Sequence, residues 1–456
     1  MGENPSIPGR QRLSFRQRIS RLSATQVLNL LFFSLIALGT GLLSLPWATQ
    51  NRHPLSFWDA LFTSTSAVCV TGLAAFDIGT RLSLFGQLVL LALIQLGGLG
   101  YMTLASLIAV ILGKISLKDR LVFQEASEQF SFDNLTAFAK RVIKLTIFLE
   151  ALGGLALFIA WRGRFPVLQT VYYSLFHSIS AFCNAGFSLF SQSLIRDQAN
   201  LTVNITIISL IVLGGLGFIV LSDLVNYIRH RTRVSTHSRI VLFTTAGLIV
   251  GGFLALFLLE FRNPATLRDL AWPAKGLICL FQSVTPRTAG FNTIPLENMT
   301  LISVMVVIFL MFIGASPGGT GGGIKTTTFA IITSTLWSTL KGRQDVNLFG
   351  RRVSLDAIRK SFALATMAFI SVILVVFLVI LFNDRFSLIQ MLFEVVSAFG
   401  TVGLSLGITP QLNAPQKVSL AVLMFLGRVG PLVVGMAVLR QSILPYRYAE
   451  EKILVG

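Results

Sequence analysis

Charged residues are scarce in this sequence. Of its 456 residues only 12% are charged, whereas 54% are hydrophobic. A water-soluble globular protein carries about 25% charged residues, so the composition excludes that class. Several runs without any charge exceed the roughly 20 residues that a helix needs to cross a bilayer, among them residues 27–48 and 362–382. We therefore expect an integral membrane protein whose surroundings are the lipid bilayer.

Acidic residues are scarcer than basic ones, 19 against 37, and the net charge is +18. The basic residues gather in short segments between apolar runs, which excludes a nucleic-acid surface; these segments are 10–21, 113–120, 227–239 and 341–352. Alternate connections carry far fewer, which is the positive-inside distribution. We expect these segments and both termini in the cytoplasm, an even number of crossings and no nucleic-acid partner.

Cysteine and histidine are too few to indicate a disulfide framework or a metal site. The cysteines at 69, 183 and 279 give no disulfide pattern, and the four histidines lack metal-ligand spacing. The first apolar run lacks a small-residue cleavage site, so we interpret it as a membrane span and not as a removed signal peptide. No cluster of catalytic residue types marks a membrane face, which leaves a polytopic membrane enzyme as a minor alternative.

A complete phosphate-binding loop is also missing, although residues 314–328, GASPGGTGGGIKTTT, hold six glycines. A Walker A loop places its lysine directly after the last glycine, after a strand and before a helix. Here Ile324 precedes Lys325, and the preceding residues 299–313 form one long apolar run. With no ATP- or NAD-binding motif elsewhere, we expect no cofactor in this chain.

The sequence does contain a fourfold repeat. Four apolar segments too short to cross a bilayer, which we interpret as re-entrant helices, are 56–68, 167–182, 272–286 and 386–399. Each is followed by a small-residue turn: CVTGL (69–73), CNAGF (183–187), RTAGF (287–291) and GTVGL (400–404). A second glycine landmark comes 24 to 28 residues later: LGGLGYM (96–102), LGGLGFI (213–219), IGASPGG (313–319) and LGRVGPL (426–432).

This registration predicts an all-α polytopic membrane protein whose unit is span, half-helix, turn and span. We expect a basic cytoplasmic N-terminus (1–24), four repeats (25–113, 114–228, 229–340 and 341–440) and a cytoplasmic tail (441–456). Within the third repeat, the six glycines and Pro317 disfavour a continuous helix. We expect that span to break at an intramembrane loop, residues 314–325, whereas the other repeats keep helix-compatible sequence at this landmark.

The four turns are suited to binding cations. Irregular backbone at membrane depth is tolerated where it is buried in protein or lines a watery cavity. Four turns that converge can offer a ring of carbonyl oxygens in place of the water around a cation, and glycine adopts the strained dihedrals this requires. The carboxyl ends of the half-helices would add partial negative charge. Four loops that merely pack the protein are the alternative, and the fourfold registration favours a pore.

The half-helix, glycine turn and glycine-bearing span together resemble the Trk/Ktr/HKT superfamily of potassium transporters, from about residue 25 to the end of the chain. Within it the sequence is similar to the KtrB branch, the membrane subunits of bacterial Ktr uptake systems; RTAGFNT (287–293) and GGTGGGIKTTT (318–328) carry the resemblance best. It implies four M1–P–M2 motifs, that is, eight transmembrane helices and four re-entrant pore helices, around one pseudo-fourfold pore. It also implies a bacterial cell (inner) membrane protein that takes up K⁺.

The resemblance assigns the ion-binding residues. It implies a K⁺ selectivity filter with these members: Val70, Thr71, Gly72, Asn184, Ala185, Gly186, Thr288, Ala289, Gly290, Thr401, Val402 and Gly403. It implies an intramembrane gate with these members: Gly314, Ala315, Ser316, Pro317, Gly318, Gly319, Thr320, Gly321, Gly322, Gly323, Lys325 and Arg428. For Lys325 the sequence leaves two positions open, facing the pore or at the cytoplasmic edge of the loop. Arg428 lies mid-span, where a charge faces the protein interior or water.

Partners follow from the resemblance as well. It implies a homodimer that packs through the C-terminal tail, and a cytoplasmic KtrA-type nucleotide-binding ring, so that nucleotide acts only through that partner. We expect uptake driven by the membrane potential, with a dependence on Na⁺ left open. The alternative is a sodium/potassium secondary transporter that works by alternating access, which predicts inverted repeats.

Four acidic residues lie in or near apolar segments. Asp77, just after the first turn, either concentrates cations at the pore mouth or is a solvated loop residue. We interpret Glu150, Asp223 and Glu394 as hydrogen-bonded structural groups and not as ion ligands.

Overall fold

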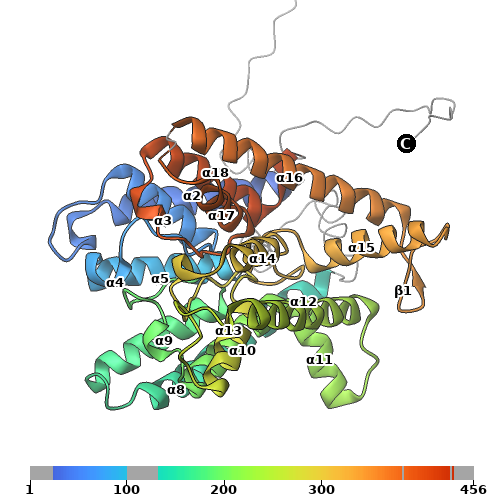
Figure 1. The fold of residues 1–456 in the computed structure, drawn as a ribbon, viewed down its shortest axis with the longest axis horizontal. Coiled ribbons are helices and arrows are strands. Elements are labelled where there is room, and N and C mark those ends of the chain that lie inside the picture. Colours follow the sequence, from blue (N-terminus) through green and yellow to red (C-terminus); the bar gives the residue numbers. More distant parts are fainter. Residues whose placement is uncertain (1–23, 100–131, 383–384, 432–433, 436–456) are drawn as a thin grey trace, which may run out of the picture.

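The chain is helical in its described parts. The computed structural model describes residues 24–99, 132–382, 385–431 and 434–435, and Figure 1 shows the helices packed around one another. Eight helices flank the predicted turns in pairs: α2 (Ala24–Leu43), α5 (Leu84–Gly98), α8 (Phe132–Trp161), α10 (Leu201–Leu216), α12 (Thr236–Glu260), α14 (Leu301–Phe312), α16 (Leu355–Phe382) and α18 (Ala414–Val429). Between the two members of each pair lies one further helix, and we call these four the short helices, after the short apolar segments of the sequence: α3 (Phe57–Val68), α9 (Val167–Phe182), α13 (Trp272–Val284) and α17 (Leu388–Gly400).

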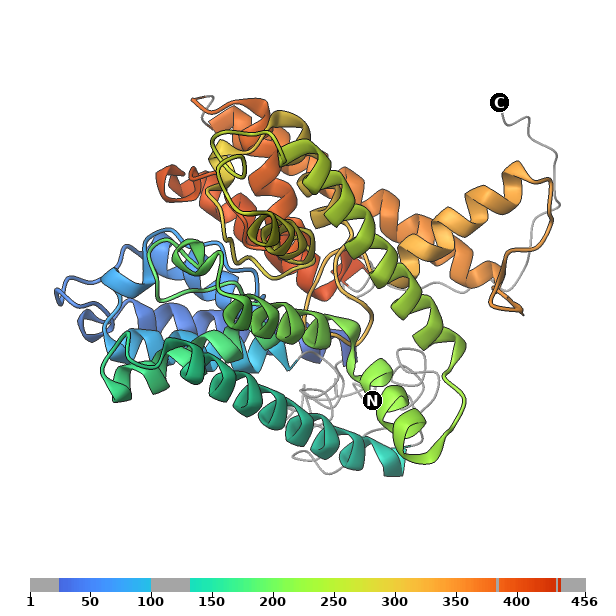
Figure 2. The same ribbon diagram turned by 60° about the horizontal axis from the view of Figure 1, so that its bottom comes forward.

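Further elements connect these helices. They are α4 (Ile78–Arg81), α11 (Phe218–His230), α15 (Thr326–Leu340) and the 3₁₀ turns η1 (Pro46–Ala48), η2 (Ile195–Asp197), η3 (Leu296–Asn298) and η4 (Thr409–Gln411). An antiparallel hairpin of β1 (Asn347–Leu348) and β2 (Arg351–Arg352) follows α15, with Asn347 paired to Arg352. Together with α15 this hairpin extends away from the main body in both views (Figure 1 and Figure 2). The N-terminal segment, the two basic segments 10–21 and 113–120, and the tail 441–456 lie outside the described residues.

Within the described residues, three helical segments are individually long and apolar enough to cross a membrane: Ala139–Trp161 of α8, α12 and α16. A fourth span is formed if α10 and α11 are counted together, although they are bent by 103°. Large apolar side chains on these helices face outward; Phe148, Leu258 and Phe377 expose 62%, 77% and 68% of their surface. Soluble proteins rarely expose apolar surface on this scale, so the outer faces of these helices are suited to lipid.

Short polar residues set where several helices begin. Ser387 Oγ accepts a hydrogen bond from Gln390 N while Gln390 Oε1 accepts one from Ser387 N, a capping box at the start of α17. Asn413 and Gln416 form the same arrangement at the start of α18. These side chains satisfy amide groups that the first helical turn leaves without partners. Each helix therefore starts at a residue that the local sequence specifies, which fixes how far α17 reaches into the protein.

Helix α18 contacts helix α3 through an ion pair. Lys417 Nζ in α18 lies 2.6 Å from Asp59 Oδ1 in α3, and the two side chains are 11% and 28% exposed. Removing one partner of a largely buried pair leaves the other charge uncompensated. This ion pair therefore joins α3, near the start of the described chain, to α18, near its end.

We expect Lys417→Met to lower the free energy of unfolding by about 1–3 kcal/mol, because Asp59 would keep its charge without a partner. Thermal unfolding of the purified protein in detergent, followed by tryptophan fluorescence, measures the change. Arg352→Gln is the matched control, because its pair with Asp345 is 67% and 47% exposed and exposed pairs contribute little. Equal melting temperatures for Lys417→Met and the wild type would show that the pair does not stabilise the fold.

Candidate ion pathway

Each of the four short helices leads into one of the predicted glycine turns. The backbone φ angles are +94° at Gly72, +69° at Gly186, +77° at Gly290 and +89° at Gly403. This is the left-handed region, which glycine enters without the steric cost of a Cβ atom. The four glycines therefore share a conformation that the turns require.

A second residue in each turn, two positions before the glycine, is also left-handed. The φ angles are +55° at Val70, +57° at Asn184, +70° at Thr288 and +50° at Thr401. Three of these residues are β-branched, for which a positive φ is strained. The sequence does not indicate this feature, because these side chains favour other dihedrals and only the surrounding contacts hold them. Strain of this kind persists where the structure over-determines it, typically at functional sites.

The turns contact one another in chain order and close a ring. A Cβ atom added to any of the four glycines would lie less than 3.0 Å from a carbonyl oxygen of the next turn. The pairs are Gly72 with Ala185 O, Gly186 with Ala289 O, Gly290 with Val402 O and Gly403 with Thr71 O. Since the fourth turn contacts the first, backbone surrounds one axis, and no side chain fits at the glycine positions.

A hydroxyl group from the last turns of each short helix supports the strained backbone. Ser66 Oγ accepts from Gly72 N at 3.0 Å and Ser397 Oγ accepts from Gly403 N at 3.1 Å. In the other two repeats the hydroxyl donates to the residue after the glycine: Ser180 Oγ to Phe187 O at 2.8 Å and Thr285 Oγ1 to Phe291 O at 2.5 Å. The one sequence signal for these residues is a serine six positions before the glycine in three repeats.

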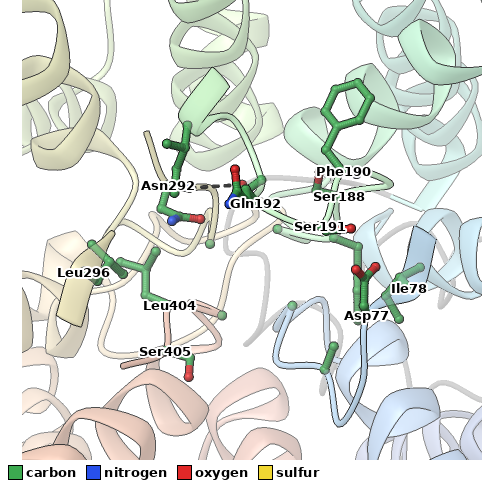
Figure 3. Close-up of a pocket in the computed structure, with 18 of the residues that line it drawn as sticks. Asp77, Ile78, Ser188, Phe190, Ser191, Gln192, Asn292, Leu296, Leu404 and Ser405 are labelled. Carbon is green, nitrogen blue, oxygen red and sulfur yellow. Dashed lines mark hydrogen bonds between the residues drawn. The ribbon is translucent and has the colours of Figure 1, made fainter. Parts of the chain in front are cut away.

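A cavity of about 380 Å³ opens on one side of the ring. All four turn glycines line it, together with residues that follow them. Figure 3 shows its labelled side chains, which come from four separate segments: Asp77 and Ile78; Ser188, Phe190, Ser191 and Gln192; Asn292 and Leu296; and Leu404 and Ser405. The ring therefore forms the floor of a vestibule that all four repeats build.

Two acidic residues line this vestibule. Asp77 Oδ1 caps α4 by accepting from Gly79 N at 2.9 Å and from Thr80 N at 3.3 Å. Glu297 is exposed at the wall. Asp77 thus combines a structural contact at the start of α4 with a position on the vestibule wall.

The glycine-rich loop lies between α14 and α15, as its composition predicts. The helix stops at Phe312 and resumes at Thr326. At the base of the loop Gly314 N donates to Ile324 O at 2.9 Å and Ala315 N donates to Gly322 O at 3.2 Å. These bonds leave residues 316–321 as a tip, and we call this segment the loop tip.

The loop tip bonds to a break in the second repeat that the sequence analysis did not predict. Ser316 N donates to Gly215 O at 3.0 Å, and Thr320 N donates to Gly214 O at 3.1 Å. Both carbonyls belong to the last turn of α10, where a helix leaves such groups without partners. In return, Phe218 N at the start of α11 donates to Gly318 O at 3.1 Å.

The expectation that the other repeats keep a continuous helix at this landmark is wrong. At Gly217, with φ of +92°, the helix direction changes by 103° between α10 and α11. At Gly430, with φ of +97°, α18 ends. Both glycines are the fifth residue of the landmark sequence, so the pattern that suited a helix also permitted a left-handed residue. The break at Gly217 is stabilised by the hydrogen bonds of the loop tip.

The loop also contacts the turns on the side away from the vestibule. Gly322 N donates to Thr401 Oγ1 at 2.9 Å, and a Cβ added to Gly321 would overlap the side chain of Thr288. Both threonines precede their turn glycines, whereas the residues after the glycines line the vestibule. The loop therefore packs against the ring on the side opposite the vestibule.

Three cationic side chains contact this loop: Arg287, Lys325 and Arg428. Arg287 donates from Nη2 to Gly314 O at 3.5 Å. Arg428 donates from its guanidinium group to Thr320 O in the loop tip and to Gly97 O in α5. Lys325 Nζ donates to Gly321 O at 2.7 Å, so this side chain points back into its own loop. Arg428 of the fourth repeat thus connects the third repeat to the first.

The other three acidic candidates from the sequence, Glu150, Asp223 and Glu394, are hydrogen-bonded. Glu150 Oε2 accepts from Gln95 Nε2 at 3.3 Å. Asp223 Oδ2 accepts from two serine hydroxyls near the start of α12. Glu394 is 1% exposed and accepts from the hydroxyls of Ser405 and Thr409. The structure places none of these three among the residues that line the vestibule.

Comparisons with known proteins agree with this architecture. A family model described as TrkH, cation transport protein, matches residues 16–451. Ktr system potassium uptake protein B of Bacillus subtilis is 39% identical over 437 residues, which cover 96% of this chain and 97% of that protein. Potassium/sodium uptake protein NtpJ of Enterococcus hirae is 37% identical over 444 residues, with coverage of 96% and 98%. The crystal structure of the potassium transporter TrkH from Vibrio parahaemolyticus matches with a TM-score of 0.69 at 19% identity, over 95% of this chain and 87% of that one.

Proposed function

Because the chain belongs to the TrkH family of cation transport proteins, we propose that it takes up K⁺ into the cell through one channel-like pore. The family match confirms the resemblance drawn from the glycine turns, and the relatives are transport proteins and not enzymes. The observation that carries the proposal is the closed ring of four glycine turns at the floor of the vestibule. Two relatives are named for potassium uptake and one of them also for sodium.

Backbone carbonyl groups of the four turns form the proposed K⁺ filter. Its residues are Val70 to Gly72, Asn184 to Gly186, Thr288 to Gly290 and Thr401 to Gly403. Paired left-handed residues in each turn and the close approach of each glycine to a neighbouring carbonyl support this assignment. Carbonyl oxygens in such a ring replace the hydration shell of the ion.

Four M1–P–M2 repeats with pseudo-fourfold symmetry form the proposed architecture around this filter. Support comes from the alternation of flanking and short helices and from the ring of contacts that follows chain order. The flanking helices would serve as the transmembrane helices, of which α8, α12 and α16 are individually long enough to cross a bilayer, and the short helices as re-entrant pore helices. Repeats in the same direction around one ring favour a pore over alternating access, which uses inverted repeats.

The loop of residues 314–325 acts as the proposed gate, held by Arg428. It lies behind the filter and bonds to Thr401, to the end of α10 and to Arg428. Hydrogen bonds from the second and fourth repeats therefore hold the closed position, while glycine-rich backbone allows the loop to adopt another. K⁺ would pass from the vestibule through the filter and then past this loop.

A cytoplasmic KtrA-type nucleotide-binding ring is the proposed regulator of the gate. The proposed assembly is a homodimer in the bacterial cell membrane, with both termini in the cytoplasm. The basic segments 227–239 and 341–352, among the described residues, supply positive charge for the cytoplasmic side. The tail proposed to pack in the dimer, 441–456, lies outside the described residues.

Uptake by cells that lack their own potassium uptake systems tests the proposed function. We expect expression of the wild-type chain with a matching regulatory ring to restore growth at low external K⁺ and to support ⁸⁶Rb⁺ uptake. External K⁺ should inhibit that uptake more strongly than Na⁺. Equal inhibition by the two ions would rule out the K⁺ filter, and absence of uptake at a normal protein level in the membrane would rule out the proposed transport.

A further inference from the structure

Around the ring, three of the four short helices carry a buried polar side chain that reaches the chain leaving the turn. In α9, His177 Nε2 lies 3.0 Å from Ser188 Oγ. In α13, Gln282 Nε2 donates to Thr293 Oγ1 at 3.3 Å. In α17, Glu394 Oε1 accepts from Ser405 Oγ. We call these the bracing pairs, since each joins a helix before a turn to the chain after it.

The second repeat has the most constrained bracing pair. His177 is fully buried, and its Nδ1 lies 2.7 Å from Tyr173 O. A carbonyl oxygen only accepts, so Nδ1 carries the proton and Nε2 accepts from the hydroxyl of Ser188. The imidazole ring also stacks on Phe190 with 4.6 Å between centroids. The imidazole of His177 is therefore held through both ring nitrogens and by stacking. Its position determines that of Ser188 at the vestibule wall.

The fourth repeat is braced at two points. Besides Ser405, Glu394 binds Thr409, whose Oγ1 donates to Oε2 at 2.8 Å. Ser405 Oγ in turn accepts from Gly407 N at 2.9 Å. One buried carboxylate thus orders the chain from the turn to η4. A carboxylate that is 1% exposed needs such donors, because a buried charge without them is costly.

The bracing pairs follow the repeat. His177 and Glu394 each stand nine positions before the turn glycine, and Ser188 and Ser405 each stand two positions after it. In the third repeat the pair is shifted by one residue. In the first repeat the corresponding residues are Thr63 and Ala74. In the part of the chain that the structure describes, Thr63 Oγ1 is buried without a hydrogen-bond partner, so this turn lacks a brace.

We propose that the bracing pairs are positioning residues for ion discrimination, an inference that rests on the proposed function. A carbonyl ring favours K⁺ when its oxygens cannot close around the smaller Na⁺ ion. The carbonyl of each turn glycine is positioned by the residues that follow it, and those residues are what the bracing pairs hold. The second, third and fourth turns are thereby held by the short helices that precede them. The first turn lacks such a pair and is the one that can deform most easily.

Removing one hydroxyl from a bracing pair tests this role. Purified wild-type protein and the variants Ser188→Ala, Ser405→Ala and Thr293→Val would be reconstituted into liposomes, and ⁸⁶Rb⁺ uptake measured with K⁺ or Na⁺ as competitor. We expect each variant to shift the ratio of Na⁺ to K⁺ inhibition toward Na⁺ by about fivefold, the factor that one ordinary hydrogen bond represents. Ser188→Thr and Ser405→Thr keep the hydroxyl and should retain the wild-type ratio.

Ser419→Ala is the control, because the Ser419 hydroxyl donates only to Pro415 O of its own helix in the described structure. An unchanged inhibition ratio in all three bracing variants, with a K⁺-preferring wild type, would overturn the bracing proposal and leave the proposed function intact. Lower uptake with an unchanged ratio would also overturn it, since that result indicates a role in folding alone. A wild type without K⁺ preference would instead contradict the proposed function and this inference together.

Discussion

Replacement of Gly290 by serine is expected to abolish the K⁺ preference of uptake and to reduce its rate more than tenfold. The residue has φ of +77°, and a Cβ atom there would lie 2.5 Å from Val402 O and 3.0 Å from the Cα of Gly186. The neighbours in question are backbone atoms of two other turns, which cannot move without widening the ring. A serine therefore costs both a left-handed dihedral and the close contact that sets the size of the proposed filter.

Gly276→Ser is the matched control for this prediction. Gly276 lies in α13 of the same repeat, and a Cβ atom there would meet nothing within 4 Å. We expect this variant to keep both the rate and the ion preference of the wild type. The measurement is ⁸⁶Rb⁺ uptake in cells that lack other potassium uptake systems, with K⁺ and Na⁺ as competitors and the amount of membrane protein determined for each variant. Wild-type preference in Gly290→Ser would refute the filter assignment.

Removal of the loop tip, residues 316–321, is expected to raise the K⁺ flux of the isolated protein about tenfold or more. The deletion removes three backbone hydrogen bonds to α10 and α11 and the contact of Thr320 O with Arg428. Each 1.4 kcal/mol lost from the closed position shifts the equilibrium tenfold toward the open one. The hydrogen bond from Gly314 N to Ile324 O at the base of the loop involves no deleted residue.

Arg428→Gln provides an independent variant, because it frees the loop tip from one side without shortening the chain; the flux should again rise. Arg359→Gln serves as its control, since Arg359 is exposed on α16 and distant in sequence from the loop. Flux into liposomes loaded with K⁺-sensitive dye, without any regulatory ring, measures the effect. A monodisperse shortened protein with wild-type or lower flux would show that this loop does not gate the pathway.

The positions of the four turns and of the interrupted helix could be predicted from the sequence, because local patterns encode them. A glycine that needs a positive φ is visible as a glycine, as at Gly72 and Gly403. Likewise, residues 314–325 contain too much glycine for a helix, and α14 does end before them. The short helices begin close to their predicted starts because capping residues such as Ser387 mark them.

The strain at Val70, Thr288 and Thr401 could not be predicted, because nothing in a β-branched residue indicates a positive φ. It arises from long-range contacts, such as the hydrogen bond from Gly322 N to Thr401 Oγ1. The bend at Gly217 could not be predicted from the sequence for the same reason. Its sequence suits a helix, and the partners that stabilise the break come from the loop tip, about 100 residues later in the chain.

The contact between Asp59 and Lys417 has a consequence for how the protein is made. The two residues are separated by 358 positions, which a ribosome takes on the order of half a minute to synthesise. Until then Thr71 O of the first turn lacks the Gly403 backbone that packs against it in the finished ring. Such late, non-local pairing makes assembly slow. The nascent chain must therefore hold three of the four turns without the fourth, so that the ring stays incomplete until residue 403 has been synthesised and placed.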